Sequence, residues 1–316
     1  MSKDNIQIEG TNDSLPLVSV CVQTYQHVNY IRECLEGILM QKTSFQFEIV
    51  IGEDESNDGT REICVEYAEK NPDKIRLFLR SRKDVIYIND NPSGRFNFIE
   101  NLKATRAKYI ALCEGDDYWT DPLKLQKQVD VLEANPEYGI CAHVVKEVNE
   151  FKNTSRLFPI INEDSAFGIV DYIANNLTGT CSLVFCRDKF SPIEDWFFTA
   201  PFGDIIVVLK VMKNTNHKIY ILKDSMSVYR VHHGGVHGRL HENTEKLIEA
   251  YKMHLVSNSL IRKNLFNDNT YQSDLVKKEI ETYKIIFSLI NKRKNPLRFI
   301  KYYATFLICK VYQKTL

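Results

Sequence analysis

Predicted strands and helices alternate through the first 140 residues, and this alternation limits the fold more than any other feature of the sequence. Short runs of β-branched and other apolar residues predict four buried strands, at 17–22, 45–51, 75–79 and 109–113. Between them, apolar residues recur at helical spacing over 30–40, 58–71 and 96–105. Strands that alternate with helices form a mostly parallel sheet covered on both faces. The expected fold class is therefore α/β.

Beyond residue 140 the pattern changes in two steps. Further strands are predicted at 138–145, 181–186 and 219–229, with a loop over 147–164 and a helix over 205–213. After Glu242 the spacing of apolar residues is almost entirely helical. We therefore expect one α/β domain over 1–240, with halves over 15–140 and 141–240, and a helical extension over 241–316.

Composition and charge narrow the class of protein. The chain has 41 Lys and Arg residues against 41 Asp and Glu residues, so its formal net charge is zero. A general nucleic-acid binder needs a basic excess to neutralise phosphates, and none is present. The eight cysteines show no C-x-x-C spacing, which favours reduced cysteines in the core. Residues 1–14 lack the apolar core of a signal peptide, and no apolar run reaches the ~20 residues of a spanning helix. The expected location is cytoplasmic.

Polar residues follow three of the predicted strands at the point where each strand ends. These segments are Gln23–Gln26, Glu53–Gly59 and Glu114–Asp117. Ligands bind beyond the carboxyl ends of parallel strands, so these segments mark the expected site. Neither G-x-G-x-x-G nor G-x-x-x-x-G-K-[ST] occurs, which argues against a dinucleotide site and a P-loop. Carboxylates gathered at one sheet edge repel one another, and they suit Mg²⁺ or Mn²⁺ bridging to a phosphate.

Each of these segments has a simpler interpretation when taken alone. Asp58 is compatible with a helix cap, Glu114–Asp117 with a solvated turn, and Tyr118-Trp119 with a packing pair. Their joint position after successive strands is what favours a site.

The three segments also resemble conserved motifs of the family 2 glycosyltransferases. Val18–His27 resembles the opening strand of that family, Glu48–Thr60 its second-strand motif, and Lys108–Trp119 its acidic metal-binding motif. The similarity is strong over residues 17–140 and patchier to residue 237. It implies a GT-A fold, in which one nucleotide-binding α/β domain is extended by an acceptor-binding half.

The resemblance implies a donor site at the strand ends. Thr24, Tyr25 and Asp54 would hold the base and ribose of a nucleotide, and Glu114 would contact the ribose. Asp116 would bind the Mn²⁺ or Mg²⁺ ion, with Asp117 as a second acidic group beside it. Gln23 and Glu55 stand where many relatives have Pro and Gly, so the detailed shape of these loops is expected to differ.

Two further segments are implied to contact the diphosphate. Phe96 occupies the position of a frequent arginine, and the adjacent Arg95 is either its replacement or a surface residue at a helix start. Arg230 and His232 resemble the Arg-x-His segment of the family, with Arg230 on the diphosphate and His232 as a donor or metal ligand. His233 is the alternative to His232. The neighbouring glycines suggest a loop that closes over the donor.

The acceptor half is implied to supply a general base. Asp204 matches the position of the catalytic carboxylate, although Gly203 replaces a frequent Glu before it. The alternative is that Asp204 caps its helix, with Asp195 as the fallback base. Trp196 and Phe202 flank this position and suit stacking on sugar rings, or simple packing.

The final segment is basic and amphipathic. No acidic residue follows Glu281, whereas eight Lys and Arg residues do, interleaved with aromatic and aliphatic residues. A contact with the inner face of the plasma membrane is one interpretation, and packing on the body or on a second subunit is the other.

Taken together, the resemblance implies a metal-dependent, inverting glycosyltransferase that uses a nucleotide-diphospho-sugar, UDP-linked, and a saccharide or lipid-linked saccharide acceptor in polysaccharide biosynthesis. A sugar nucleotidyltransferase is the second enzyme hypothesis, but Gln23–Gln26 lacks the Gly-rich, basic loop that it predicts. A non-catalytic subunit that binds a nucleotide-sugar or glycan is the third hypothesis, and it would not need Asp204.

Overall fold

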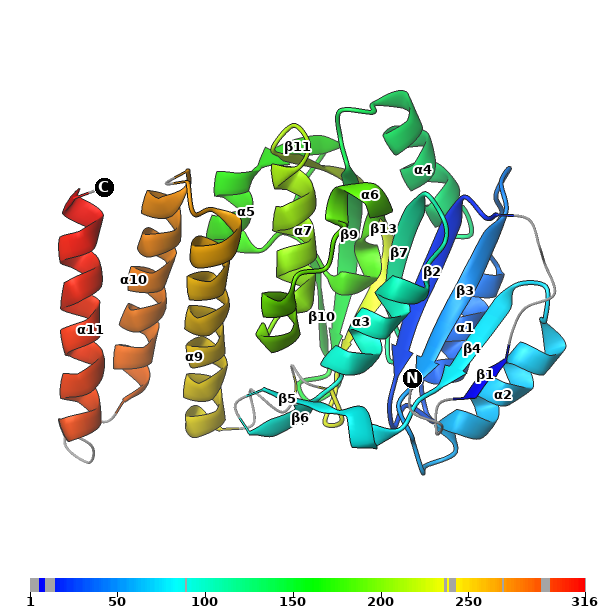
Figure 1. The fold of residues 1–316 in the computed structure, drawn as a ribbon, viewed down its shortest axis with the longest axis horizontal. Helices are drawn as coiled ribbons and strands as arrows, with labels where there is room; N and C mark the ends of the chain where they lie inside the picture. The colour runs from blue at the N-terminus through cyan, green and yellow to red at the C-terminus, as the bar shows by residue number, and fades with distance from the viewer. Residues whose placement is uncertain are drawn as a thin grey trace.

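The computed structural model describes residues 6–8, 15–88, 90–235, 238, 243–268, 270–290 and 296–315. Four parallel strands form the first half of its large sheet, in the order β4-β3-β2-β7 (Figure 1). Their bounds are Val18–Thr24 for β2, Phe47–Glu53 for β3, Ile75–Leu79 for β4 and Tyr109–Glu114 for β7. All four lie where the sequence predicts them, and the α/β class is confirmed.

The second half of the sheet is mixed in direction. Beyond β7 the order continues β12-β9-β13-β11, in which only the β9–β13 pair is parallel. The bounds are Ile140–Asn149 for β9, Ser165–Gly168 for β11, Val184–Cys186 for β12 and Lys218–Val231 for β13. Short strands complete the edges: β1 (Ile6–Ile8) on β4, β8 (Tyr118–Trp119) on β13, and β10 (Thr154–Phe158) on β9. The loop expected over 147–164 is therefore partly wrong, because β10 forms a hairpin with an extended β9.

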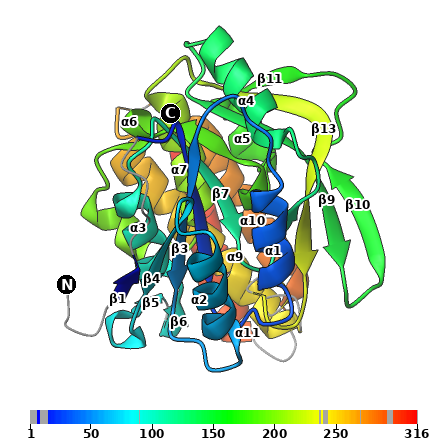
Figure 2. The ribbon, with the colours of Figure 1, turned by 90° about the vertical axis from the view of Figure 1, so that its right-hand side faces the viewer.

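Helices cover both faces of the sheet because successive strand residues point to opposite faces. Ala111 and Cys113 of β7 belong to one apolar cluster, whereas Ile110 and Leu112 belong to the other. The first cluster is covered by α1 (Ile31–Leu39), α2 (Thr60–Lys70) and α4 (Lys124–Ala134). The second is covered by α3 (Arg95–Ala104), α5 (Ile169–Asn175) and α7 (Gly203–Lys213). Figure 2 shows α1 and α3 on opposite sides of the sheet.

Short elements join these layers. They are η1 (Arg82–Asp84), β5 (Ile86–Ile88), β6 (Asn91–Ser93), η2 (Thr180–Ser182), α6 (Arg187–Phe190) and η3 (Asp195–Thr199).

Three long helices form the expected helical extension. These are α9 (Thr244–Leu260), which runs into a π-helical turn η4 (Ile261–Leu265), α10 (Gln272–Leu289) and α11 (Pro296–Thr315). They stand in a row at the end of the molecule opposite β3 and β4 (Figure 1). Leu275 of α10 packs into the second core cluster, which attaches the extension to the α/β body. The boundary expected near residue 240 falls outside the described residues.

The cysteines and the long helices bear on two expectations from composition. All eight cysteines are free, and six of them are buried, as expected of small core residues. In the part of the chain that the structure describes, no helix combines the length and the apolar character that a membrane-spanning segment needs.

Candidate active site

The register of the parallel strands brings the three polar segments to one edge of the sheet. Gln23 of β2 pairs with Gly52 of β3 on one side and with Glu114 of β7 on the other. The residues after Thr24, Glu53 and Glu114 therefore emerge next to one another. This is the edge at which open α/β sheets bind ligands.

Tyr25 and Asp54 lie at one end of this edge and are linked by Arg82. The guanidinium of Arg82 lies 4.1 Å from the centroid of the Tyr25 ring, and its Nη1 donates to Asp54 Oδ2 at 2.6 Å. Tyr25 is 39% exposed, so its ring remains accessible to a ligand, whereas Asp54 and Thr24 are buried. Burial raises the pKa of Asp54 and the charge of Arg82 opposes that shift. Arg82 is a site residue that the sequence analysis missed, because no quoted motif covers the end of β4.

Glu55 explains one departure from the family pattern. Its φ of +60° lies in the left-handed region, where glycine is the usual residue. Its carboxylate accepts a hydrogen bond from the Arg82 N–H at 2.6 Å, and this bond lowers the pKa of Glu55. The side chain that replaces glycine therefore fastens the η1 segment, including Arg82, to the second-strand loop.

Glu114, Asp116 and Asp117 form an acidic cluster beyond β7, with one ligand atom of each within 4.8 Å of the others. Burial, followed by the charges of Asp116 and Asp204, raises the pKa of Glu114 to about 8. Burial likewise raises the pKa of Asp117 well above its ordinary value. Burial also acts to raise the pKa of Asp116, but the imidazoles of His27 and His232 outweigh it and leave that pKa lowered.

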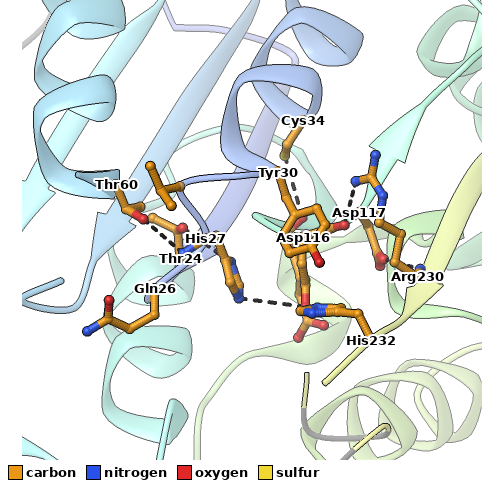
Figure 3. Close-up of polar contacts among 12 residues, drawn as sticks. Thr24, Gln26, His27, Tyr30, Cys34, Thr60, Asp116, Asp117, Arg230 and His232 are labelled. Atoms are coloured by element: carbon orange, nitrogen blue, oxygen red, sulfur yellow. Dashed lines mark hydrogen bonds and ion pairs between the residues drawn. The ribbon is translucent and has the colours of Figure 1, made fainter. Parts of the chain in front are cut away.

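Two histidines converge on a single oxygen of Asp116 (Figure 3). His232 Nε2 lies 3.0 Å from Asp116 Oδ2, and His27 Nε2 lies 3.6 Å from the same atom. His233 instead packs its ring against Phe151, 4.0 Å between centroids. The structure thus places His232 rather than His233 beside the acidic cluster. His27 ends the first-strand segment Val18–His27, and nothing in the sequence indicated that it would reach the acidic cluster.

The donor set of this cluster fits a divalent cation. Asp117 Oδ1 accepts the N–H of Arg230 at 2.9 Å, while its buried Oδ2 has no hydrogen-bond partner among the described residues. An uncompensated carboxylate oxygen inside an acidic cluster is costly without a cation. Carboxylate oxygens together with an imidazole suit Mn²⁺ or Mg²⁺.

Arg230 holds the acidic loop in place. Its Nη1 donates to the Asp116 carbonyl at 2.7 Å, its Nη2 pairs with the Glu33 carboxylate, and its guanidinium lies 4.2 Å from the Tyr118 ring centroid. The ring centroid of Tyr30 lies 5.1 Å from the same guanidinium. Glu33 lies in α1, and Tyr30 immediately precedes that helix. The helical spacing of apolar residues gave no sign that either residue contacts Arg230.

Arg95 lies in a different environment from the one expected. It is only 7% exposed, and its Nη2 donates to the carbonyls of Ala200 at 2.6 Å and Pro201 at 3.1 Å. It is therefore not the surface residue that one interpretation expected. Its guanidinium is engaged by the chain that leads into α7, rather than projecting toward a diphosphate.

Asp204 is the second residue of α7 and not its cap. The N-cap position is Phe202, so Asp204 lies two residues inside the cap, where the backbone N–H groups of Ile205 and Asp204 act to lower its pKa. Asp204 Oδ2 lies 3.5 Å from the Thr180 hydroxyl, and burial raises the pKa of its carboxyl group. The charge of Asp204 also raises the pKa of Glu114, so the two carboxyl groups are close enough to interact electrostatically. The fallback residue Asp195 is exposed on η3.

The two candidate acceptor residues have different neighbours. Phe202 stacks on His254 of α9, with 4.2 Å between ring centroids and 23° between planes. Trp196 packs at the margin of the second core cluster. The helical extension therefore reaches the segment that carries Asp204.

The sequence profile of the family described as glycosyl transferase family 2 matches residues 19–189, more than half of the chain. This chain belongs to glycosyl transferase family 2. The matched range contains the three polar segments that follow β2, β3 and β7, and the resemblance inferred from those segments is confirmed.

Curated relatives of this family 2 chain extend the match beyond residue 189. An uncharacterized protein of Mycobacterium tuberculosis is 34% identical over 241 residues, which cover 74% of this chain and 64% of that protein. The match thus spans less than two thirds of that relative. An uncharacterized glycosyltransferase of Nostoc is 28% identical, covering 70% of this chain and 66% of that one. The putative teichuronic acid biosynthesis glycosyltransferase TuaG of Bacillus subtilis is 24% identical, covering 57% and 66%.

Solved structures share the fold of the family 2 chain at low sequence identity. Residues 1–349 of Staphylococcus aureus TarS, in complex with UDP-GlcNAc, align with a TM-score of 0.53 and 17% identity, covering 94% of this chain and 92% of that one. The mannosyltransferase PcManGT of Pyrobaculum calidifontis, in complex with GDP-Man and Mn²⁺, aligns with a TM-score of 0.53 and 14% identity, covering 96% and 84%. These similarities confirm the expected GT-A fold.

Proposed function

We propose that this protein is an inverting glycosyltransferase that moves a sugar from a UDP-linked donor to a saccharide or lipid-linked saccharide. The observation that carries the proposal is the arrangement of three groups along one sheet edge. Tyr25 and Asp54 stand at one end, the acidic cluster follows, and Asp204 of the acceptor half is close enough to that cluster for its charge to raise the pKa of Glu114. A nucleotide, a diphosphate and an anomeric carbon would occupy these places in that order.

The base end suits uracil. Uracil presents one imide N–H between two carbonyl oxygens, and the Asp54 carboxylate is an acceptor for that N–H. Arg82, which is held on Asp54, carries further N–H donors for the carbonyl oxygens. The exposed Tyr25 ring offers a surface for stacking. Glu114 is the candidate contact for the ribose.

The diphosphate end suits a divalent cation held by Asp116, Asp117 and His232. When bound, Mn²⁺ or Mg²⁺ supplies positive charge beside the diphosphate leaving group. Arg230 supports this end indirectly, because its bonds to the Asp116 carbonyl and to Glu33 fix the acidic loop. We assign it this role rather than direct contact with the diphosphate.

The transfer itself needs a base on the acceptor side. Asp204 would accept the proton of the acceptor hydroxyl as that oxygen attacks the anomeric carbon. The bond from the anomeric carbon to the diphosphate oxygen breaks, its electron pair leaves with the diphosphate, and the configuration inverts. Burial raises the pKa of Asp204, which makes it a stronger base than an exposed aspartate.

We further propose that α11 contacts an anionic membrane surface. Phe299, Tyr302 and Phe306 of α11 pack against α10, while Ile300 and Ile308 are 61% and 67% exposed. Tyr303 and Leu307 are also exposed, at 45% and 44%. The helix thus has a second apolar face that nothing in the described structure covers.

Charge favours a lipid surface over a second copy of the chain for this face. Of the 41 basic residues, eight lie beyond Glu281, leaving 33 in residues 1–281 with all 41 acidic residues. A basic segment with an exposed apolar face is attracted to anionic lipid, and the acidic body is repelled by it. The helix therefore directs one end of the molecule toward the surface on which a lipid-linked acceptor would lie.

The test of the proposed reaction is turnover of UDP-, GDP-, dTDP- and CMP-sugars, measured with Mn²⁺ and with a chelator. We expect one UDP-sugar to be hydrolysed with Mn²⁺ and to give a product of inverted anomeric configuration by NMR. Turnover that is unaffected by the chelator, or a product of retained configuration, contradicts the proposal. Tight Mn²⁺-dependent binding without turnover, even with saccharide acceptors present, favours the binding-subunit hypothesis instead.

A further inference from the structure

Arg95 is a buried cation that forms no direct ion pair with a carboxylate among the described residues. Its side chain lies against the rings of Phe98 and Phe197, with 5.6 and 5.2 Å to the centroids, and its Nε has no hydrogen-bond partner. Burial lowers its pKa to about 10, and the charges of Asp204 and Glu114 oppose that shift. A buried guanidinium without a direct ion pair is less favourable than an apolar side chain of similar size. Packing alone therefore does not account for an arginine here.

The two carbonyls that Arg95 binds belong to the segment that delivers Asp204. Ala200 and Pro201 accept its Nη2, and α7 begins two residues later. Arg95 is itself the first residue of α3. The guanidinium thus joins the start of α3 to the start of α7, from opposite halves of the fold.

Gly203 provides the space that the guanidinium fills. A Cβ built on Gly203 would lie 1.9 Å from Arg95 Nη1 and 2.9 Å from both its Cζ and Phe98 Cε1. Gly203 does not have a positive φ, so a side chain there is excluded by Arg95 rather than by backbone conformation. The buried Arg95 side chain therefore requires glycine at position 203, where the family frequently has Glu.

We infer that Arg95 is a positioning residue for the general base, and that Arg95 and Gly203 act as a pair. The guanidinium fastens Ala200 and Pro201 so that the first turn of α7 presents the Asp204 carboxylate to the acceptor hydroxyl. This role rests on the proposed function of Asp204. It predicts that loss of the pair slows transfer and leaves the nucleotide end of the site intact.

The test compares Arg95→Met, Gly203→Ala and the double variant with the wild-type protein. Arg95→Met is expected to lower kcat for the UDP-sugar by about 10²-fold, because a displacement of about 1 Å at a catalytic group has an effect of that size. The affinity for UDP with Mn²⁺ is expected to stay unchanged. Gly203→Ala is expected to lower kcat in the wild-type background and to add little in the Arg95→Met background.

Gly94→Ala is the matched control. It lies next to Arg95, a Cβ there meets nothing within 4 Å, and its φ of −75° suits alanine. We expect it to leave kcat unchanged. An unchanged kcat in Arg95→Met, or a Gly203→Ala effect of equal size in both backgrounds, overturns the pairing.

Hydrogen exchange of the backbone amides over residues 200–206 separates this inference from the proposed function. Arg95→Met is expected to speed exchange in that segment and not in β2 or β7, whether or not any donor is turned over. Unchanged exchange in the 200–206 segment overturns the positioning role. If Arg95→Met does not fold, Gly203→Ala tests the same contact with the arginine retained.

Discussion

His232 places its Nε2 3.0 Å from Asp116 Oδ2, although 116 residues separate the two in the chain. The acidic loop after β7 and the loop after β13 are therefore parts of one site. The pairing of β8 with β13 accounts for this meeting, because Tyr118, which closely follows Asp116, pairs with Val228, which shortly precedes His232. A strand of two residues, β8, thus holds the acidic cluster beside His232.

Replacing the proposed base removes catalysis but not donor binding. Asp204→Asn keeps the size of the side chain and loses its ability to accept a proton. We expect kcat to fall by about 10²–10⁴-fold, the usual contribution of a general base. The affinity for UDP with Mn²⁺ is expected to stay at the wild-type value, measured by titration calorimetry. An active Asp204→Asn enzyme contradicts the assignment and directs attention to Asp195.

Replacing the proposed base-binding carboxylate has the opposite effect. Asp54→Asn removes an acceptor for the imide N–H and the charge that holds Arg82. A hydrogen bond to a charged group contributes about 1.5–3 kcal/mol, so the Kd for UDP is expected to rise by at least tenfold. The affinity for inorganic pyrophosphate with Mn²⁺ serves as the control and is expected to stay unchanged. Equal losses for both ligands would place Asp54 outside the base site.

Sequence patterns predicted the residues of the candidate site that directly follow buried strands. The ends of β2, β3 and β7 are fixed by buried apolar runs, and polar residues that follow parallel strands must emerge at the same edge. Tyr25, Asp54 and the acidic cluster were found in this way.

The contacts that support these residues depend on distances across the fold. Glu33 reaches Arg230 across 197 residues, and Arg95 reaches the Ala200 carbonyl across 105. Periodicity describes only which face of a helix is apolar, and Arg95 at the start of α3 gave no sign of being buried. The hairpin of β9 and β10 was missed for a related reason, since the residues of β10 are mostly exposed and show no buried strand pattern.

Lys124 predicts a pH-dependent stability that is separate from the site. Its side chain is fully buried, its Nζ donates to Gln128 Oε1 at 2.8 Å, and burial lowers its pKa to about 8. Between pH 8 and its ordinary pKa of 10.5, the unfolded chain holds a proton that the folded protein has lost. The free energy of unfolding contributed by Lys124 therefore rises with pH across this window, by up to about 3 kcal/mol.

Lys124→Met removes this titration and is the variant to compare. We expect the free energy of unfolding of the wild-type protein, measured in urea, to rise relative to that of Lys124→Met between pH 8 and pH 10. A difference between the two proteins that stays constant over this range contradicts a lowered pKa for Lys124.

The exposed face of α11 predicts binding to anionic vesicles. The wild-type protein is expected to sediment with vesicles of phosphatidylglycerol and phosphatidylcholine, but not with pure phosphatidylcholine, and to be released by salt. Ile308→Asp is expected to weaken this binding by about tenfold or more, because it removes an apolar side chain from the lipid contact. Ile160→Asp is the matched control, since Ile160 is 90% exposed but lies far from α11 in the chain. Equal sedimentation of both variants rules out a membrane role for this face, and a dimer that Ile308→Asp dissociates assigns it to a second copy.

Asp116 is proposed to hold a cation on which nucleotide binding depends, and calorimetric titration of UDP into the metal-free protein measures this dependence. We predict that UDP binds with Mn²⁺ and at least about tenfold more weakly with chelator, and that Asp116→Asn abolishes this difference. Equal affinity for UDP with Mn²⁺ and with chelator in the wild-type protein would contradict the account.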